Sequence, residues 1–359
     1  MPALSTEESV RLRILNFPLI IGVVYIHAFS ISIDYAGERL GVEHVNYLTE
    51  FVRLFISQGL ARIAVPLFFL MSGYFFFLGF TWSWQGYVQK LTVRIKTLLA
   101  PYLFWTSLIF AVSFLGHSSP AVAAYFPEFK QLLDNFSVYV LLNSMFGLTW
   151  VPEAYHFWFI RDLIYLMVLS PLIVVVLRYA AWPFFIAIFW LWITANWSIY
   201  TPDVVGVLFF SFGGYMGMKR KSLFILDRYG AWFVAAYIII LAVDVIWYTA
   251  PFNLCLHRCG IVVGLVATLF ITKRILAHKR LTDSLLWLSG SSFFVYAAHE
   301  PLLGIIRTIA FQYSPVQLPY TMLLIYLLVP LAVIASLVWL HNVLGACFPN
   351  ALKVVTGGR

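Results

Sequence analysis

Residues 57–80 read SQGLARIAVPLFFLMSGYFFFLGF, and this run predicts the class of the fold. Its only charged residue is Arg62. A helix of this length can cross a bilayer, which needs roughly 20 mostly apolar residues. Nine other runs share this character, near residues 14–33, 97–115, 156–177, 183–200, 204–218, 231–250, 260–273, 286–309 and 321–341. The sequence therefore predicts an all-α integral membrane protein, a bundle of about ten transmembrane helices.

The composition of the whole chain agrees with a membrane environment. Of the 359 residues, 62% are hydrophobic and 11% are charged, whereas a soluble domain carries about 25% charged residues. No repeat and no separate polar region interrupts the runs, so we expect one membrane domain over residues 1–359. The first run lacks an evident small-residue cleavage site, and we expect it to remain as a helix. The three cysteines form no metal or redox motif, and we expect no metal: Cys255, Cys259 and Cys347.

The distribution of basic residues gives the bundle a direction. The chain has a net charge of +8. Its Lys and Arg residues lie between the apolar runs and not in a soluble basic domain, which argues against nucleic acid as a partner. With a cytoplasmic N-terminus, the inner segments contain sixteen basic residues: Arg11, Arg13, Lys90, Arg94, Lys96, Arg178, Lys219, Arg220, Lys221, Arg228, Lys273, Arg274, Lys279, Arg280, Lys353 and Arg359. The outer segments contain four: Arg39, Arg53, Lys130 and Arg258. Such a bias predicts that both termini are cytoplasmic.

The longest predicted external segment covers residues 116–155 and ends in Trp150-Val-Pro-Glu153. A segment of this length can cover a site that opens outward. The apolar piece at 137–148 is too short for a span, and we interpret it as interfacial or re-entrant.

Three histidines fall in the outer half of the membrane under this topology. His27 lies late in the first span, His156 at the outer boundary of the fourth and His299 late in the ninth. Ionisable groups within a bilayer usually face a protein interior or a hydrated cavity. A neutral imidazole there can accept a proton from a hydroxyl, although the position of His27 fits a structural histidine equally well. The convergence of the three predicts one site.

Two helical faces carry further polar groups. In the fourth span, spacing of i, i+3, i+4, i+7 brings together Trp158, Arg161, Asp162 and Tyr165. In the ninth span, one face contains Ser292, Tyr296 and His299. The adjacent Arg161 and Asp162 fit a structural pair as well as a direct role. In a regular helix, Glu300 points about 100° away from His299, and Pro301 breaks the helix just beyond.

The second span and the segment after it contain small and basic groups. Arg62 needs a partner within the membrane, and Ser72-Gly73-Tyr74 suits the close approach of another helix. Lys90 and Arg94 stand four residues apart on one helical face. On the cytoplasmic side they suit a phosphate-bearing cofactor such as coenzyme A, and they fit ordinary positive-inside charge as well.

These segments resemble the acyltransferase-3 family of membrane O-acyltransferases, in order and over nearly the whole chain. The family's first motif is a histidine late in the first span, here His27. Three more follow: Pro66-Leu-Phe-Phe-Leu-Met-Ser-Gly-Tyr74, His156-Phe-Trp-Phe159 and Tyr296-Ala-Ala-His-Glu-Pro301. The stretch HFWFIRDLIYLMVLSPL, residues 156–172, looks most like bacterial enzymes that O-acetylate surface glycans.

The resemblance implies transfer of an acyl group, usually acetyl from cytosolic acetyl-CoA, to a hydroxyl of a lipid-linked or exported glycan. It places the enzyme in the bacterial cytoplasmic membrane, in contact with lipid. It implies catalytic roles for His27, His299, Arg62 and Arg161, with His27 as general base. It implies that the acyl donor is bound by Lys90, Arg94, Ser72 and Tyr74. Acceptor binding falls to His156, Trp158, Tyr296 and Glu300.

One position departs from the family pattern. Members often have an arginine eleven residues before the first histidine, and this chain has Asn16 there. Arg13 or Arg11 are the possible substitutes, one turn or more earlier, and the assignment of that role stays open.

A transporter or flippase for a polyprenyl-linked sugar would use the same buried charges as a substrate path. The two halves of the sequence show no paired repeats and no corresponding broken helices. The enzyme hypothesis fails if the purified protein binds no acetyl-CoA and acylates no glycan, yet moves a lipid-linked sugar. A non-catalytic scaffold would leave the converging histidines unexplained.

Overall fold

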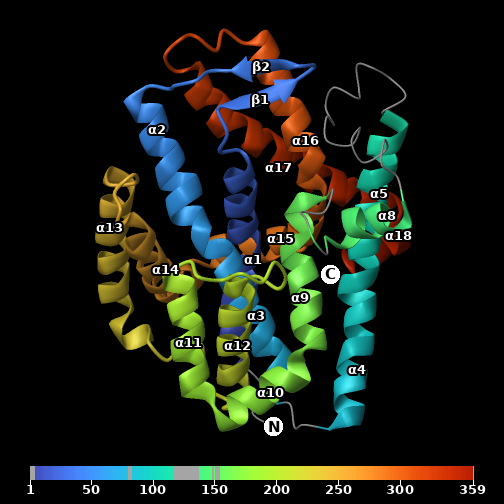
Figure 1. Cartoon of the computed structure of the whole chain (residues 1–359), viewed down its shortest axis with the longest axis vertical. Coiled ribbons are helices and arrows are strands. Elements are labelled where there is room, and N and C mark those ends of the chain that lie inside the picture. The colour runs from blue at the N-terminus through green and yellow to red at the C-terminus, as the bar shows by residue number, and fades with distance from the viewer. Residues whose placement is uncertain (1–4, 80–82, 117–136, 148, 150–153, 359) are drawn as a thin grey trace. The chain divides into compact units, whose positions relative to one another are not determined.

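The computed structural model describes residues 5–79, 83–116, 137–147, 149 and 154–358, and most of these are helical (Figure 1). The chain forms two compact units whose segments alternate along the sequence. Unit 1 comprises Met1–Val23, Gln58–Ile95 and Asp162–Ser292. Unit 2 comprises Val24–Ser57, Lys96–Arg161 and Phe293–Arg359. Because neither unit is a contiguous stretch, no linker in the sequence marks them, and a single domain over 1–359 stays a prediction.

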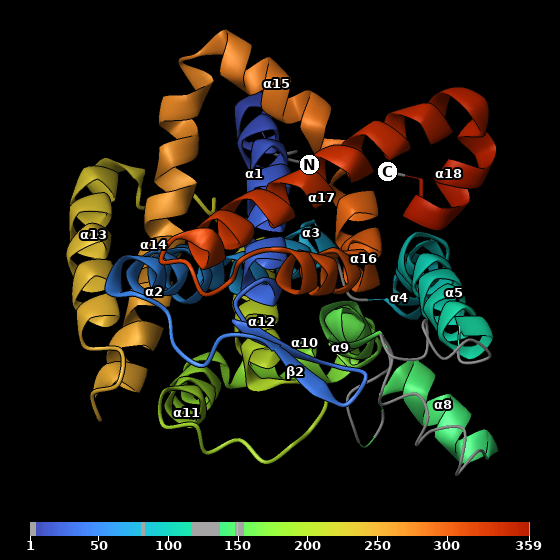
Figure 2. The same ribbon diagram turned by 90° about the horizontal axis from the view of Figure 1, so that it is seen from above.

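Unit 1 is helical and contains most of α1 (Thr6–His27). Its other helices are α3 (Ala64–Phe77), α4 (Trp84–Arg94), most of α9 (Trp158–Val168), α10 (Ser170–Tyr179), α11 (Ala181–Ile193), α12 (Val204–Met218), α13 (Gly230–Ile246), α14 (Asn253–Leu276) and α15 (Lys279–Ser289). Short 3₁₀ turns precede α3 and α13, at Leu60–Ile63 and Asp227–Tyr229. Helices α13 and α14 pack side by side, as Figures 1 and 2 both show.

Unit 2 contains the end of α1 and a hairpin of two strands. Its elements are β1 (Ser32–Tyr35), β2 (Glu38–Gly41), α2 (Tyr47–Arg53), α5 (Ala100–Gly116), α8 (Val138–Phe146), a 3₁₀ turn at Tyr155–Phe157, α16 (Ser292–Tyr313), α17 (Thr321–Cys347) and α18 (Pro349–Thr356). π-Helical stretches follow α2 and α4, at Leu54–Gly59 and Ile95–Leu99. Most of the predicted external segment, Trp150–Glu153 included, lies outside the described residues, and its piece at 137–148 contains α8.

The first helix is shorter at its end than the sequence predicted. We expected a span through residue 33, but α1 ends at His27 and the chain turns back as the β1–β2 hairpin. Between the strands Ala36 and Gly37 have φ angles of 54° and 84°, the positive values that a two-residue type I′ turn requires. The hairpin packs against a buried apolar cluster of α16 and α17: Phe311, Met322 and Ile325.

Helices α3 and α12 approach closely enough to place backbone against backbone. A Cβ atom on Gly73 of α3 would overlap the Phe210 carbonyl, and one on Gly213 of α12 would overlap the Leu70 carbonyl. Only glycine fits at such contacts. The close approach expected at Ser72-Gly73 is therefore present in the structure, with α12 as the neighbouring helix.

A buried arginine fixes the first half of α1 within unit 1. Arg11 is 3% exposed. Its guanidinium donates to Asp227 at 2.6 Å and 3.0 Å, to the Thr272 hydroxyl at 2.8 Å and to the Leu269 carbonyl at 2.9 Å. Arg13, by contrast, is exposed and donates to the Ser289 hydroxyl at 3.4 Å. Of the two possible substitutes for the arginine missing at position 16, Arg11 thus has its donors engaged with α14 and the Asp227 turn.

Six helices of the described residues are long and apolar enough to cross a membrane: Thr6–His27, Tyr47–Phe77, Trp84–Gly116, Asp227–Ile246, Asn253–Leu276 and Thr321–Cys347. A seventh span is possible if Tyr155–Val168 and Ser170–Tyr179, bent by 65°, act together. The predicted spans 183–200 and 204–218 appear as shorter apolar helices, and 286–309 is divided between α15 and α16. The structure supports an all-α membrane protein, while ten spans and cytoplasmic termini stay predictions.

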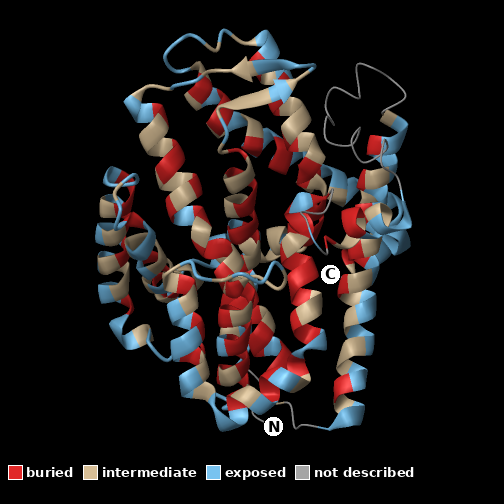
Figure 3. Cartoon of the chain, viewed as in Figure 1, coloured by how far each residue is buried: buried red, intermediate tan, exposed pale blue. Residues whose placement is uncertain are grey.

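The burial pattern also fits lipid contact. In Figure 3, α12 is largely buried, whereas α13 is mostly intermediate or exposed. The exposed side of α13 is nevertheless apolar, since Trp232, Ile238 and Ile239 are 77%, 61% and 65% exposed. A soluble monomer rarely exposes such a continuous apolar face.

Candidate active site

Three histidines lie close together in unit 2. The ring centres of His27 and His299 are 5.2 Å apart, and those of His156 and His299 are 5.0 Å apart. His27 is the last residue of α1, His156 belongs to the 3₁₀ turn before α9, and His299 lies in α16. The proximity that the sequence predicted for these side chains is present in the structure. We call them the histidine cluster.

The hydrogen bond of His299 identifies the nitrogen that carries its proton. Nδ1 lies 2.6 Å from the Tyr296 carbonyl oxygen. A carbonyl only accepts, so Nδ1 donates, and in the neutral ring Nε2 carries the lone pair. That Nε2 is buried, and no described residue hydrogen-bonds to it. His299 therefore offers a proton acceptor inside the cluster.

His156 has the opposite tautomer. Its Nε2 lies 3.3 Å from the Ala297 carbonyl oxygen and donates to it, so Nδ1 carries the lone pair in the neutral ring. This buried Nδ1 has no hydrogen-bond partner among the residues described. The Tyr296 hydroxyl donates to the His156 carbonyl at 2.6 Å. The hydroxyl hydrogen of Tyr296, which was predicted to bind the acceptor, is therefore engaged in a hydrogen bond that holds the His156 turn against α16.

Helix α16 breaks directly after His299. Glu300 has non-helical angles, with φ −107° and ψ 139°, and Pro301 follows. The break at this proline was predicted, but the angle of about 100° between His299 and Glu300 assumed a regular helix and does not apply. Instead, the buried Glu300 carboxyl lies close enough to the Tyr155 hydroxyl for the two groups to interact.

Tyr155 belongs to the site although the sequence analysis did not identify it. Its ring meets the His27 ring edge-on, with 5.1 Å between centres. Arg307 lies near enough to interact electrostatically with both Tyr155 and Glu300. The only sequence signal for Tyr155 was its place next to His156, because the helical-face argument began at Trp158.

Arg161 and Asp162 have different partners. The buried Arg161 donates through Nη1 to the Gly147 carbonyl, 2.8 Å away, at the end of α8. Asp162, in unit 1, accepts from the Thr201 hydroxyl at 2.8 Å and from the backbone N–H of Asp203 at 2.6 Å. Both have structural contacts, and Arg161 shares unit 2 with the histidine cluster and with Trp158.

The other predicted residues belong to unit 1. Arg62 finds its expected partner one turn earlier, donating through Nε to the Gln58 side-chain oxygen at 2.9 Å. Ser72 and Tyr74 lie on α3, with Tyr74 buried. The structure does not bring these residues together with the histidines in one compact unit.

The predicted donor-binding pair also lies in unit 1, on α4. Lys90 donates to the Phe76 carbonyl and lies over the Phe76 ring, 5.3 Å from its centre. Arg94 is the last residue of α4, one turn beyond Lys90. The two cations therefore share a helical face, while Lys96 is exposed in the π-helical stretch that follows.

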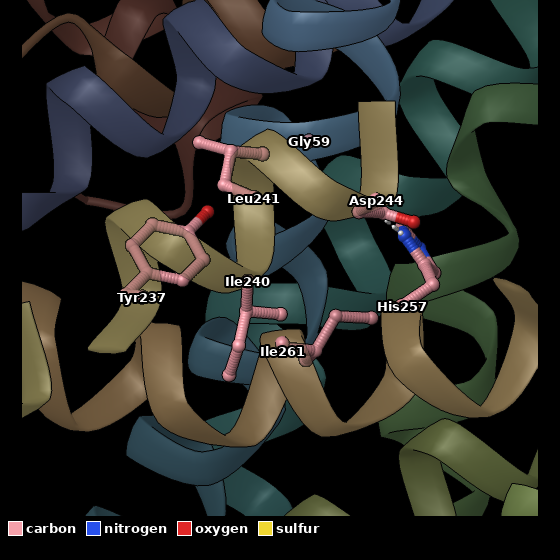
Figure 4. Close-up of a pocket in the computed structure, with 8 residues that line it drawn as sticks. Gly59, Tyr237, Ile240, Leu241, Asp244, His257 and Ile261 are labelled. Atoms are coloured by element: carbon pink, nitrogen blue, oxygen red, sulfur yellow. Dashed lines mark hydrogen bonds and ion pairs between the residues drawn. The ribbon is translucent and has the colours of Figure 1, made fainter. Parts of the chain in front are cut away.

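A second polar cluster lies between α13 and α14 of unit 1, beside a small cavity (Figure 4). Asp244 accepts from His257 Nδ1 at 2.8 Å and from Asn253 Nδ2 at 2.7 Å. In Figure 4 Asp244 and His257 face each other across the helix pair. The cavity beside this polar cluster, of about 10 Å³, has room for a single water molecule. No group of three or more potential metal ligands occurs in the described part of the chain.

Comparisons with known proteins agree with the order of these motifs. Residues 15–340 match the model of the acyltransferase-3 family, described as an acyltransferase domain. The chain is 28% identical to the succinoglycan biosynthesis protein ExoH of Rhizobium meliloti (strain 1021), over 99% of this chain and 94% of that protein. No solved structure matches. Because the family match covers nearly the whole chain and includes every residue of the histidine cluster, the chain belongs to the acyltransferase-3 family and is an O-acyltransferase.

Proposed function

We propose that this enzyme transfers an acetyl group from acetyl-CoA to a hydroxyl of a lipid-linked or exported surface glycan, with His27 as general base. The observation that carries the proposal is the pair of buried imidazole nitrogens, His156 Nδ1 and His299 Nε2, with no partner among the described residues. Buried polar atoms are nearly always hydrogen-bonded. Hydroxyls of a sugar that enters the cluster would satisfy them, because each hydroxyl has one hydrogen to donate to one nitrogen.

The glycan acceptor is supported by the relative from Rhizobium meliloti, whose name assigns it to succinoglycan biosynthesis. The apolar exposed helices support a place in a membrane, where lipid surrounds the protein and a lipid-linked saccharide is accessible. We propose the bacterial cytoplasmic membrane, because the donor is cytosolic and the acceptor is exported.

The chemistry follows from the cluster. The His27 imidazole takes the proton of the acceptor hydroxyl as its oxygen attacks the thioester carbonyl. The carbon–sulfur bond then breaks, and the proton passes from the imidazolium to the departing thiolate. His299 Nε2 relays or holds the proton, while His156 Nδ1 accepts a hydrogen bond from the sugar. Glu300, Trp158 and Tyr296 support the acceptor.

The remaining roles belong to the arginines and to the donor site. Arg161 and Arg62 are our candidates for stabilising the negative oxygen of the tetrahedral intermediate, since preorganised donors are effective there. Lys90 and Arg94 bind the phosphates of coenzyme A, because a guanidinium matches phosphate geometry and an ammonium supplies a point charge. Ser72 and Tyr74, on the neighbouring α3, complete the donor site.

The test compares glycans from cells that produce wild-type protein, His27→Ala and His44→Ala. His44 is an exposed histidine of unit 2 and serves as the matched control. We expect mass spectrometry to show the acyl increment with wild type and His44→Ala, and its loss with His27→Ala at equal membrane expression. Unchanged acylation with His27→Ala would refute the general-base role. Purified protein that neither binds acetyl-CoA nor acylates a glycan would refute the proposed reaction.

A further inference from the structure

The end of helix α1 at His27 poses a hydrogen-bonding problem. The last four carbonyls of a helix have no partner within it, and an unsatisfied carbonyl in an apolar environment costs several kcal/mol. Two of the four receive backbone donors from the chain that follows. Ala28 N–H donates to the Val24 carbonyl at 3.1 Å, and Phe29 N–H to the Ile26 carbonyl at 3.4 Å. The carbonyls of Tyr25 and His27 remain.

A buried serine satisfies the Tyr25 carbonyl. The Ser57 hydroxyl, in the π-helical stretch after α2, donates to it at 2.5 Å and lies 2.8 Å from the Tyr326 hydroxyl of α17. Ser57 is fully buried. The Tyr25 hydroxyl in turn donates to the Leu327 carbonyl at 2.8 Å. The last turn of α1 is thereby fixed to two neighbouring elements of unit 2.

Arginine satisfies the His27 carbonyl. Arg307 Nη1 donates to it at 3.2 Å, and Nη2 of the same side chain donates to the Ser30 carbonyl. Arg53 donates through Nε to the Phe29 carbonyl at 3.1 Å, with its guanidinium over the Phe29 ring. Cations are favourable at a helix C-terminus, and a guanidinium can bind two carbonyls at once in a fixed geometry.

The same arginine also reaches the ring side of His27. Arg307 interacts electrostatically with Glu300 and with Tyr155, and the Tyr155 ring meets the His27 ring edge-on, with 5.1 Å between centres. Arg307 therefore hydrogen-bonds the backbone of His27 and also interacts electrostatically with the tyrosine that packs on the His27 ring. Arg307 is the residue common to both ends, and it is 6% exposed.

We propose that Arg307, Arg53 and Ser57 are positioning residues that hold His27 in the geometry in which it accepts the proton. The inference rests on the proposed function, because it assumes that His27 is the base. These three residues do not touch substrate in this account. Ser57 and Arg307 act through the carbonyls of the last turn of α1, and Arg307 acts additionally through Glu300 and Tyr155. Arg53 acts through the Phe29 carbonyl, two residues beyond that helix.

The experiment measures kcat and both KM values of the purified full-length enzyme as wild type, Arg307→Gln, Ser57→Ala and His27→Ala. Arg39→Gln, an exposed arginine of the hairpin, and Ser144→Ala, a buried hydroxyl of α8, are the matched controls. We expect Arg307→Gln and Ser57→Ala to lower kcat roughly 10- to 100-fold, as displacement of a catalytic group does. Both KM values should stay within about twofold. Added guanidinium should restore part of the kcat of Arg307→Gln.

Three results would overturn the proposal, each in a recognisable way. Wild-type kcat in Arg307→Gln and Ser57→Ala, with His27→Ala inactive, would remove the positioning role and leave the proposed function intact. A loss that follows the amount of folded protein in thermal melts, without guanidinium rescue, would make the residues structural only. Activity in His27→Ala would refute the proposed function itself. If Arg307→Gln does not accumulate, Ser57→Ala alone decides by the same kcat criterion.

Discussion

Each of two rings in the histidine cluster has one nitrogen bound to backbone and one buried nitrogen with no partner among the described residues. In His299 the bound nitrogen is Nδ1, and in His156 it is Nε2. Amide side chains can copy one nitrogen of imidazole at a time. Asn approximates Nδ1 and Gln approximates Nε2, so the backbone bond and the lone pair can be separated experimentally.

We predict that His299→Asn keeps a donor to the Tyr296 carbonyl but loses the Nε2 lone pair. Its kcat should fall by about 10²- to 10⁴-fold, the usual contribution of a proton-transfer group. His156→Gln keeps the donor to the Ala297 carbonyl and loses Nδ1. Because that nitrogen binds the acceptor in our proposal, the acceptor KM should rise about tenfold, as expected for one lost hydrogen bond.

Steady-state kinetics with purified protein measure both effects, and melting temperature reports whether the backbone bonds survive. His44→Asn and His44→Gln are the controls, since His44 is exposed in the same unit. Wild-type kcat in His299→Asn would show that the Nε2 lone pair is not needed for proton transfer. An unchanged acceptor KM in His156→Gln would remove His156 from acceptor binding.

At this scale the sequence predicted the ionisable residues of the site better than their supports. His27, His156 and His299 were visible because ionisable groups are rare in apolar spans. Ser57 and Arg53 act on backbone carbonyls, and the position of α1's end decides which carbonyls are free. That end was predicted at residue 33 and not at His27. The supports could therefore be identified only from the structure.

Among the elements, helices α3 and α12 pack backbone against backbone at Gly73 and Gly213. The Ser72-Gly73-Tyr74 motif had predicted such a close approach. We predict that Gly213→Ala destabilises the enzyme by about 1–3 kcal/mol, the usual cost of overpacking. The added Cβ would overlap the Leu70 carbonyl, which belongs to the backbone and cannot rotate away. Thermal unfolding in detergent, followed by tryptophan fluorescence, measures the loss.

The matched control is Gly290→Ala, in the same unit. A Cβ there meets its nearest atom at 3.4 Å, an ordinary contact, and φ is −64°. Its melting temperature should stay near that of wild type. Equal stability of Gly213→Ala and Gly290→Ala would mean that α3 and α12 can separate without cost.

The differences between predicted and observed elements have physical causes. Hydropathy recognises apolar runs but not where a helix breaks within one, as between α15 and α16 in the predicted span 286–309. It also cannot see the hairpin, whose turn depends on positive φ at Ala36 and Gly37. The small-residue signal at Gly73 was informative because its cause is local: only glycine allows backbone contact.

For the whole molecule, composition was sufficient to predict an all-α membrane protein. The expected number of spans was less secure, because runs such as 183–200 contain helices too short to cross alone. The division into two units was invisible in the sequence, since each unit consists of three separate segments. This division matters for function. The proposed donor residues belong to unit 1, and the histidine cluster belongs to unit 2.

Because the proposed donor residues and the histidine cluster belong to different units, we predict that donor binding can be weakened without changing acceptor binding. Arg94→Gln should raise the KM for acetyl-CoA about 10- to 100-fold, because one charge-assisted phosphate contact contributes roughly 1.5–3 kcal/mol. It should leave the acceptor KM unchanged. We choose Arg94 over Lys90 because the Lys90 ammonium also binds the Phe76 carbonyl, so its removal would disturb α3 as well. Lys96→Gln, an exposed cation nearby, is the control and should keep the wild-type donor KM.

The double variant Arg94→Gln/His299→Asn extends this test. If the two residues serve separate steps and share no partner, their effects on kcat/KM should add in free energy within about 0.5 kcal/mol. Initial rates at varied acetyl-CoA and fixed acceptor are measured for the four proteins of this double-mutant cycle: wild type, the two single variants and the double variant. An unchanged donor KM in Arg94→Gln would mean that Arg94 does not bind the donor and that the basic residues of α4 are ordinary positive-inside charge. A large coupling energy would mean instead that α4 and the histidine cluster act on the same step, with the donor's phosphates and its thioester bound as one unit during proton transfer.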